Sequence, residues 1–574
     1  GGSSQTATAK GGFDLSGSTG AISVTDSAQG AVASSVLGGS TVSITSTSNA
    51  AGATTGTITV GSATKAPTGD VTITSSIVEA KGTTNTAGGA IAVTGGEDVV
   101  ITQSASKAVQ PTALANGTIT NAAVTVTGKA TTKSVTVDSS AAVAAVNTVL
   151  AVAAVTEVNT LTFAALTAGQ TQILNGLTFT AGSAGTTAAQ TAAAFSNLTA
   201  GATNGPSTKG TYSGAFSSEG WTSGAVGGTA AAPTVVFTGT KAAARTNLAD
   251  SGTGTDPTVV VTTDGVTAVK AVGNTGVTAN TVAVTDASNA LGVAAGTITD
   301  VTAHNYTTLA VNSNALTNLN VLGGSGNITI GNALTGNTAK TLNLSVDGVT
   351  GGTLDDADVY TTLNVATKYT GASTTTSSTL ANVTSTSVDD LNVSGDNVLI
   401  LSSTAGMTGL INVDVNGTAG LSGAFAATTM KTIDTSGTTG TATITFDATK
   451  ATYTGGAGVD AVTTSAVAPT KAISLGAGDD SLTLAPGTTA VTGAISGGDG
   501  TDTLVMVAAD IVTADNDLAF SSLVTGFETL YVALSTGGQN INLTNMGQTS
   551  SVIVGASAGT GVVTLTNLAS GGTV

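Results

Sequence analysis

Cysteine is absent from this 574-residue chain, and histidine, tryptophan and arginine each occur once. Without cysteine, disulfides cannot stabilise the fold, so another device has to lock it, and a bound metal ion is the obvious substitute. Only 8% of the residues are charged and 3% are aromatic, fewer than in a conventional enzyme of this size. No run of about 18 apolar residues occurs, which predicts that the chain has no membrane span.

Small residues dominate instead. Glycine contributes 76 residues, and alanine, threonine, serine and valine are abundant. Small side chains can fill only a thin core, and a thin core suits a solenoid, in which each coil buries its few aliphatic side chains against the next. Disorder is the competing interpretation of so much glycine, serine and threonine, but the mean hydropathy of +0.34 argues against it.

Short runs in which Val or Ile alternates with Thr or Ser recur from Gly20 to Asp138 and again after about residue 266. Such alternation, bounded by Gly, Asn and Asp, is typical of half-buried β-strands. Examples are AISVTD, TVSITST, DVTITSS and SVTVDSS in the first stretch and NTVAVTDAS, TLNLSVDG, TTLNVAT and LINVDVNG in the second. The sequence therefore predicts an all-β fold of parallel β-helix or β-roll (solenoid) segments, with an array of β-sandwiches as the alternative.

The composition changes between residues 151 and 268. This stretch carries several aromatic residues, namely Phe163, Phe179, Phe195, Tyr212 and Trp221. Helical spacing of Ala and Phe over Thr186–Leu198 predicts one short helix. Because aromatic side chains supply a conventional core, we expect 151–268 to be a small inserted domain. The predicted organisation is an irregular β-solenoid at 1–150, this insert, a β-solenoid at 269–450 and a further β region at 451–574.

Three related strings occur in the last of these regions. They are GGAGVDAVT (Gly455–Thr463), LGAGDDSLT (Leu475–Thr483) and GGDGTDTLV (Gly497–Val505). The first and third match G-G-x-G-x-D-x-U-x, the nonapeptide that wraps calcium in parallel β-rolls, and the second has Leu475 in place of the first glycine. The strings start 20 and 22 residues apart, about one solenoid coil, so we expect them to stack on one side of the solenoid.

The chemistry of these strings favours a calcium site. Glycines permit positive-φ turns that aim backbone carbonyls inward, and aspartates add charge and side-chain oxygens. Stacked carboxylates repel one another until an ion such as Ca²⁺, which takes about six to eight oxygens, lies between them. The predicted metal-site residues are Gly455, Ala457, Val459, Asp460, Gly476, Gly478, Asp479, Asp480, Gly497, Asp499, Thr501 and Asp502.

The charge balance is acidic, with 33 Asp and Glu against 15 Lys and Arg and a net charge of −18. Such a chain would repel phosphate backbones, so we expect no nucleic-acid partner. The balance fits a surface protein held by divalent cations. Looser acidic groups could hold further ions, although each is first interpreted as a solvated turn: Asp355, Asp356 and Asp358; Asp389, Asp390 and Asp396; Asp515 and Asp517; Glu97 and Asp98.

The strings and their surroundings resemble the calcium-binding RTX-type S-layer proteins of Gram-negative bacteria, best known from Caulobacter. The resemblance rests on the run from Gly455 through GGDGTDTLV to FETLYV (Phe527–Val532) and on AIAVTGGEDVVITQ and AVTVTGKATTKSVTV earlier, and it excludes 151–268. It implies a right-handed β-helical rod, type I secretion and a place on the bacterial cell surface. It also implies that copies of the chain assemble, with calcium, into a two-dimensional lattice.

Members of this family hold lipopolysaccharide through a separate N-terminal domain. No equivalent is visible in this sequence, so lipopolysaccharide contact is expected only through a segment outside it. The sequence opens at GGSSQTATAK without an initiator Met or a signal peptide, and we interpret it as a fragment or a processed product.

RTX proteins include proteases, lipases and toxins, so an enzyme has to be weighed. His304 is the only histidine, which excludes an H-E-x-x-H zinc protease site and leaves any Ser-His-Asp triad dependent on a residue among strand-like repeats. We therefore expect a structural protein and not an enzyme. The alternative function is an RTX-type adhesin whose insert binds a ligand through Tyr212, Phe216 and Trp221, unless these aromatics form the core of the insert.

Overall fold

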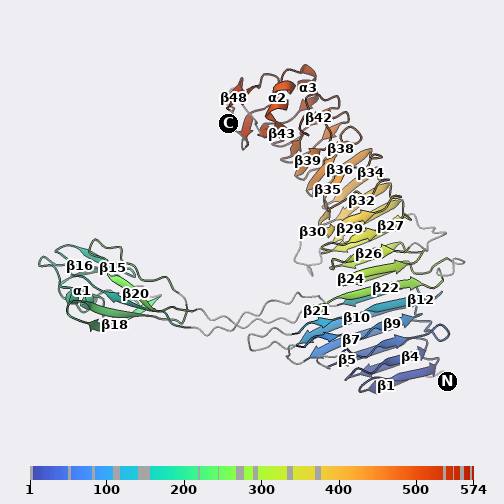
Figure 1. The fold of residues 1–574 in the computed structure, drawn as a ribbon, viewed down its shortest axis with the longest axis horizontal. Helices are drawn as coiled ribbons and strands as arrows, with labels where there is room; N and C mark the ends of the chain where they lie inside the picture. The colour runs from blue at the N-terminus through green and yellow to red at the C-terminus, as the bar shows by residue number, and fades with distance from the viewer. Residues whose placement is uncertain are drawn as a thin grey trace. The chain divides into compact units, whose positions relative to one another are not determined.

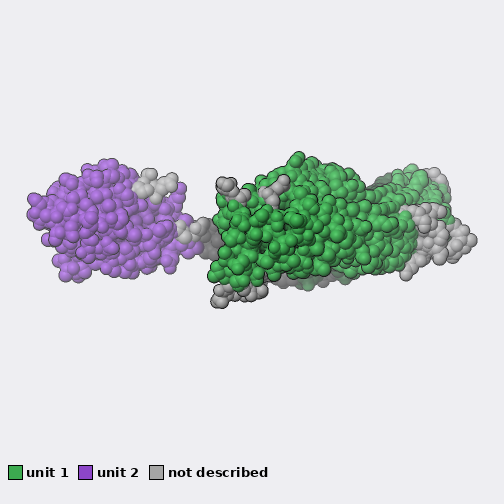
Figure 2. All heavy atoms as spheres, turned by 90° about the horizontal axis from the view of Figure 1, so that it is seen from above, with its two compact units in different colours: residues 1–108, 117–144, 276–574 green, residues 109–116, 145–275 purple. Residues whose placement is uncertain are grey.

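The computed structural model describes residues 4–49, 54–79, 84–107, 117–139, 155–216, 220–243, 245–266, 277–288, 295–331, 341–368, 377–533, 538–546, 549–555, 562–568 and 572–574. The chain divides into two compact units (Figure 2). Unit 1 comprises Gly1–Ala108, Gly117–Ala144 and Gly276–Val574, and unit 2 comprises Val109–Asn116 and Ala145–Thr275. The expected insert boundaries at 151 and 268 lie outside the described residues.

Unit 1 is a parallel β-solenoid, drawn in Figure 1 as a stack of strands from the blue N-terminal end to the red C-terminal end. In its first sheet of 17 strands, each strand pairs in parallel with that of the next coil. These strands are β1 (Gln5–Ala9), β3 (Ile22–Asp26), β5 (Val42–Ser48), β7 (Val71–Glu79), β10 (Asp98–Lys107), β13 (Ser134–Ser139), β23 (Asp300–His304), β25 (Asn318–Leu322), β27 (Thr341–Asp347), β29 (Thr362–Lys368), β32 (Asp390–Gly395), β34 (Asn412–Gly417), β36 (Thr432–Thr438), β38 (Thr452–Thr454), β40 (Ile473–Ser474), β42 (Ile495–Ser496) and β44 (Val524–Thr525).

Two further long sheets and two short ones complete the coils. The ten-stranded sheet contains β2 (Asp14–Ser18), β4 (Ser34–Gly38), β6 (Ile58–Val60), β9 (Ile91–Thr94), β12 (Val124–Gly128), β22 (Asn280–Asp286), β24 (Tyr306–Asn312), β26 (Asn327–Ile330), β28 (Thr353–Asp355) and β31 (Asn382–Thr384). The nine-stranded sheet contains β30 (Ser377–Leu380), β33 (Val398–Leu401), β35 (Gly420–Phe425), β37 (Ala442–Phe446), β39 (Asp460–Thr464), β41 (Ser481–Thr483), β43 (Thr503–Val507), β45 (Thr529–Ala533) and β47 (Ser551–Val554). The short sheets contain β8 (Thr86–Ala87), β11 (Ile119–Thr120) and β21 (Val277–Thr278), and β46 (Gln539–Asn542) and β48 (Val563–Thr566).

The alternation in the sequence decides which side chains enter the core. In β5, Val42 and Ile44 are buried, while Ser43 and Thr45, which follow them, are exposed. Equivalent residues of successive coils form one continuous apolar core through unit 1. Burial of each Val or Ile side chain contributes about 1.5–3 kcal/mol, so a coil is stable only against its neighbours. The predicted all-β parallel solenoid is confirmed.

The solenoid is continuous across the segment that forms unit 2. Strand β12 pairs in parallel with β22, with Val124 opposite Val282. Strand β13 pairs with β23, with Ser134 opposite Asp300. The coils before and after unit 2 are therefore direct neighbours, and the chain enters unit 2 between two adjacent coils.

Unit 2 is built from antiparallel strands around an aromatic core. Its four-stranded sheet has the order β18 (Trp221–Gly228), β19 (Pro233–Gly239), β14 (Val158–Thr162) and β20 (Thr258–Thr263), and its three-stranded sheet the order β15 (Thr171–Leu174), β16 (Leu177–Ala181) and β17 (Gly210–Gly214). The rings of Phe163 and Phe195 stack at 5.8 Å between centroids, and Phe179 and Phe237 are fully buried. This core is separate from that of unit 1.

The predicted helix of unit 2 is present but shorter than expected. Helix α1 covers Ala188–Ala194, against the predicted Thr186–Leu198. It begins after Thr187, whose side chain forms a capping box with Gln190. Its C-cap is Phe195, whose backbone, with φ of −115° and ψ of 14°, is no longer helical. Asn197 then has a left-handed φ of +54°, so the predicted helix could not have continued to Leu198.

Two helices interrupt the coils of unit 1 near the C-terminal end. Helix α2 (Ala508–Ala514) and helix α3 (Leu518–Leu523) lie in the chain between β43 and β44. Neither they nor any other helix within the described residues has the length and apolarity needed to cross a membrane.

Candidate metal centre

The three glycine–aspartate strings occupy successive coils in register. Each string ends in a strand of the nine-stranded sheet, β39, β41 or β43, and these strands pair in order. Val462, Leu482 and Leu504 lie opposite one another and are at most 3% exposed. The strings therefore stack as their spacing predicts, and the apolar residue after each aspartate enters the core.

Three aspartates of these strings form a buried column. The backbone N–H of Asp460 donates to Oδ1 of Asp480 at 2.8 Å, and that of Asp480 donates to Oδ1 of Asp502 at 2.9 Å. The residues are 1%, 2% and 0% exposed, respectively. Each carboxyl group of the column thus lies against the turn of the preceding coil, inside the protein.

Within the part of the chain that the structure describes, one carboxyl oxygen of each aspartate has no hydrogen-bond partner. These oxygens are Oδ1 of Asp460 and Oδ2 of both Asp480 and Asp502. A buried carboxylate without compensating partners is destabilising by several kcal/mol. The folded column is therefore stable only when protons or cations neutralise its carboxylates. The other oxygen of Asp460 accepts a hydrogen bond from the hydroxyl of Tyr453 at 2.9 Å, which sequence reasoning missed.

The protonation behaviour of the column reflects its burial. Burial raises the pKa of Asp460 and that of Asp480 to about 6 each, from 3.8. At Asp480 burial is the largest cause, and the neighbouring carboxylates Asp460 and Asp502 contribute to the same rise in pKa. Burial also raises the pKa of Asp502, and the charge of Glu528 adds to that rise. An oxygen-binding cation would remove the same penalty without protons.

Backbone carbonyls converge on the column at two glycines. A Cβ atom on Gly455 would lie 1.7 Å from the carbonyl oxygen of Leu475 and 2.4 Å from Oδ2 of Asp460. A Cβ atom on Gly497 would lie 1.8 Å from the carbonyl oxygen of Gly526 and 2.6 Å from Oδ2 of Asp502. Only glycine fits at either position, because oxygens from two coils occupy the space that a Cβ atom would need. We refer to each such group of oxygens as a cradle.

Calcium fits this set of donors, because carboxylate and carbonyl oxygens are the ligands it prefers. No three Asp, Glu or His side chains gather around one point in the part of the chain that the structure describes. Carbonyls of the turns would therefore have to supply much of the coordination. Asp460, Asp480 and Asp502 would hold the ions, and bound calcium would neutralise the column and clamp neighbouring coils together.

The remaining predicted site residues lie on the outer side of the turns. The side chains of Asp479 and Asp499 are exposed, as are Ala457, Val459 and Thr501. Oδ1 of Asp479 accepts a hydrogen bond from the backbone N–H of Thr501 at 2.9 Å. The glycines occupy the turns themselves, and Gly476 and Gly478 have the predicted positive φ values, +100° and +142°. The structure thus brings three of the five predicted aspartates together.

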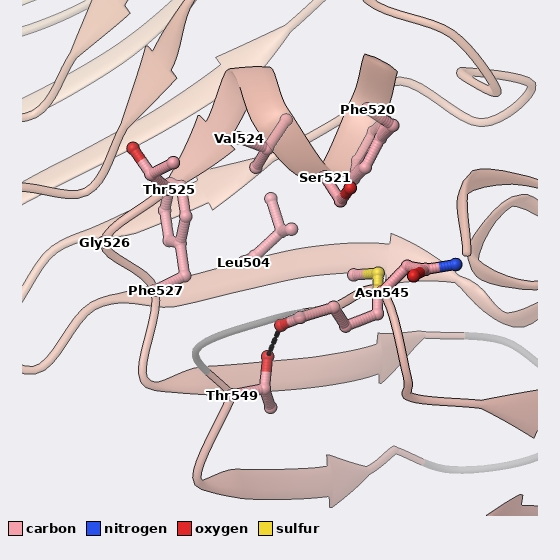
Figure 3. Close-up of a pocket in the computed structure, with 10 residues that line it drawn as sticks. Leu504, Phe520, Ser521, Val524, Thr525, Gly526, Phe527, Asn545 and Thr549 are labelled. Carbon is pink, nitrogen blue, oxygen red and sulfur yellow. Dashed lines mark hydrogen bonds between the residues drawn. The ribbon is translucent and has the colours of Figure 1, made fainter. Parts of the chain in front are cut away.

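Sequence reasoning also missed a fourth acidic residue next to the column. Oε2 of Glu528 accepts a hydrogen bond from the backbone N–H of Asp502 at 2.9 Å. The turn that carries Glu528 borders a small cavity of about 20 Å³, toward which Leu504, Phe520 and Val524 project (Figure 3). The turn is therefore packed against helix α3.

The looser acidic groups take part in local hydrogen bonds. Asp356 is buried and accepts from the hydroxyl of Ser385 at 2.9 Å, and burial raises its pKa to about 6. Among the other groups, Glu97 pairs with Lys133, Asp98 accepts from Ser134, Asp390 accepts from Asn412, Asp515 accepts from Asn545 and Asp517 caps helix α3. Glu97, Asp98, Asp390 and Asp517 are partly or fully exposed, as expected of solvated turns and strand ends. Asp356 and Asp515 are each only 2% exposed, so the interpretation as a solvated turn was wrong for them.

The single histidine lies on the sheet of unit 1. Nδ1 of His304 lies 2.8 Å from Oδ1 of Asp138 in the neighbouring coil, and the two side chains are 28% and 46% exposed. The pair bridges the coils on either side of the chain segment that forms unit 2.

No protein-family model matches the sequence, and a search of curated proteins finds no relative.

Proposed function

We propose that this protein is a structural S-layer component that assembles, in the presence of calcium, into a two-dimensional lattice on the outer surface of a bacterium. The observation that carries the proposal is the buried column of Asp460, Asp480 and Asp502, in which one oxygen of every carboxyl group has no hydrogen-bond partner among the described residues. The resemblance of the three strings to RTX-type S-layer proteins supports the same conclusion.

Calcium would couple folding to the place where the protein works. In the calcium-poor cytosol the buried carboxylates repel one another, and the C-terminal coils stay unfolded and ready for export. Outside, calcium at millimolar concentration stabilises the folded state by binding to it alone. Affinities of about 10⁻⁴–10⁻³ M, typical of extracellular calcium modules, are sufficient.

Assembly would use contacts between copies of the chain. A solenoid presents repetitive surfaces along its length, so copies can associate through sheet edges or through calcium between acidic surfaces. A solenoid built from a chain in which only 8% of the residues are charged and 3% are aromatic suits a scaffold better than an enzyme.

The adhesin alternative assigned ligand binding to aromatic residues of the insert. Trp221 is 4% exposed and Phe216 is fully buried, and both belong to the core of unit 2. Tyr212 packs against Phe179, with 5.0 Å between ring centroids. Side chains in these positions stabilise unit 2 and present little surface to a ligand, which favours the scaffold.

Electron microscopy and circular dichroism test the proposal together. The full chain is stripped of metal with a chelator and then given millimolar calcium. We expect β structure in the C-terminal coils and ordered sheets to increase when calcium is added to the wild type, and adding calcium to increase neither of them in the double variant Asp480→Asn/Asp502→Asn. Glu97→Gln, an exposed acidic change in a distant coil, is the control. Full β structure without calcium, or a monomer that binds glycans instead of forming sheets, would contradict the proposal.

A further inference from the structure

The last coil of the column replaces a six-residue turn by a three-residue turn. Strands β42 and β44 pair with Ser496 opposite Thr525, and strands β43 and β45 pair with Thr503 opposite Thr529. Between the same two register positions, the third string therefore has residues 497–502 and the next coil has only residues 526–528. The shorter turn contains no G-G-x-G-x-D motif, yet it ends at the same position on the solenoid.

Glu528 occupies in this short turn the register position that the aspartates occupy in the longer ones. Its carboxylate accepts the backbone N–H of Asp502 at 2.9 Å, the distance at which Asp502 accepts the N–H of Asp480. Glutamate is one methylene longer than aspartate. The extra length compensates for the shorter turn and brings the carboxylate to the corresponding point, so Glu528 continues the column.

Next to Glu528 lies Asp502, which has a buried carboxyl oxygen that could bind a cation. Asp502 is fully buried, and no described residue forms a hydrogen bond with its Oδ2. This oxygen and the carbonyl oxygen of Gly526 both approach Gly497 closely. They lie 2.6 and 1.8 Å, respectively, from where a Cβ atom of residue 497 would lie. Glu528 follows Gly526 by two residues, so its carboxylate belongs to the same turn.

The column ends on either side at uncharged residues. Asp460 lies opposite Ala442 of the preceding coil. Thr529 lies opposite Ser551, which places Ser550 next to Glu528. The set of in-register acidic residues is therefore Asp460, Asp480, Asp502 and Glu528, across four consecutive coils.

We propose that Glu528 is a ligand for a divalent cation of the calcium type, which it binds together with Asp502 between the third string and the short turn. The inference rests on the proposed calcium dependence and deepens it, because it places a binding position outside the glycine–aspartate motif. Oxygen donors alone select a hard cation such as Ca²⁺ over a transition metal.

Isothermal titration calorimetry with calcium chloride on the full, metal-stripped chain tests the inference, with wild type, Glu528→Gln, Glu528→Asp and the control Glu97→Gln. We expect both changes at Glu528 to weaken at least one calcium site about tenfold or more. Glu528→Asp keeps the charge but has a shorter side chain, so it should weaken calcium binding as Glu528→Gln does. Glu97→Gln changes an exposed ion pair with Lys133 and should match wild type.

Wild-type calcium binding by both Glu528 variants would overturn this inference and leave the proposed function standing. Wild-type binding by Glu528→Asp alone would overturn the argument from side-chain length. A wild-type chain that binds no calcium would overturn the proposed function and this inference with it. If Glu528→Gln does not fold, the calcium-induced rise in Tm of Glu528→Asp is measured in place of the titration of Glu528→Gln. A rise equal to that of wild type would count against the inference.

Discussion

The backbone N–H of Asp480 donates to Oδ1 of Asp502 at 2.9 Å, which holds a buried carboxyl of one coil against the turn of the coil before it. The second oxygen of Asp502 has no hydrogen-bond partner among the described residues, and the residue is fully buried. The stability of the C-terminal coils therefore depends on whether protons or cations neutralise these carboxyl groups.

Replacing Asp480, the middle aspartate of the column, by asparagine should have opposite effects on stability with and without calcium. The amide of Asp480→Asn retains an oxygen that can accept the N–H of Asp460 but carries no charge. In the metal-free chain we expect this change to raise the free energy of unfolding by about 1 kcal/mol or more, because repulsion and desolvation are relieved. In millimolar calcium it should lower the Tm below that of wild type, because a ligand is lost.

Thermal melts followed by circular dichroism measure both effects. Asp434→Asn is the matched control, because Asp434 lies in a nearby coil and caps a turn through the N–H of Ser436. A variant at position 480 that is destabilised equally in both conditions would show that Asp480 contributes only packing.

The metal-free chain should be more stable in mild acid than at neutral pH. Burial raises the pKa of Asp460 and Asp480 from 3.8 in the unfolded chain to about 6, so the folded state binds protons more tightly. The stabilisation by protons is complete below the unfolded pKa and is lost as the pH rises through about 6. Denaturant titrations of chelator-treated, desalted protein between about pH 4 and 7.5 measure this. Stability that rises over this range, or that is independent of pH in wild type and Asp480→Asn alike, would contradict it.

Glycine at position 497 should be essential for steric reasons. An alanine Cβ there would lie 1.8 Å from the carbonyl oxygen of Gly526 and 2.6 Å from Oδ2 of Asp502, so it would force the oxygens of this cradle apart. We expect Gly497→Ala to be destabilising by about 1–3 kcal/mol and to abolish one calcium site. Gly30→Ala is the control, since nothing lies within 4 Å of its Cβ position. Equal Tm values and calcium isotherms for the two variants would refute the cradle.

Unit 2 should be removable without unfolding the solenoid. The strands before and after it already pair in register, Val124 with Val282 and Ser134 with Asp300. A chain in which Ala145–Thr275 is replaced by a short glycine–serine linker should keep the calcium response and a Tm within a few degrees of that of the full chain, because both cores are separate. Loss of cooperative unfolding in this deletion would mean that the solenoid needs unit 2.

The strands and the aspartate column could be predicted because each follows from a local pattern. Alternation in segments such as β5 identifies the side chains that face the core, with Val42 and Ile44 inward. The repeated G-x-G-x-D pattern of the strings places Asp460, Asp480 and Asp502 at the same point of each turn. A local pattern is sufficient wherever neighbouring coils have turns of equal length.

Glu528 could not be predicted in this way, because its turn is three residues shorter and only strand register shows that it continues the column. The exposed positions of Asp479 and Asp499 were also missed, because the motif does not show which aspartate of a turn faces inward. The antiparallel sheets of unit 2 depend on pairings between segments far apart in sequence, such as Val158–Thr162 with Thr258–Thr263.

A crystal structure of the calcium-loaded chain, with anomalous diffraction data that locate calcium, tests the central claim most directly. We predict calcium peaks between successive turns of the column, about 2.4 Å from oxygens of Asp460, Asp480 and Asp502. Calcium found only at exposed acidic residues, with the three buried carboxyl groups unliganded in crystals grown at neutral pH, would contradict the account.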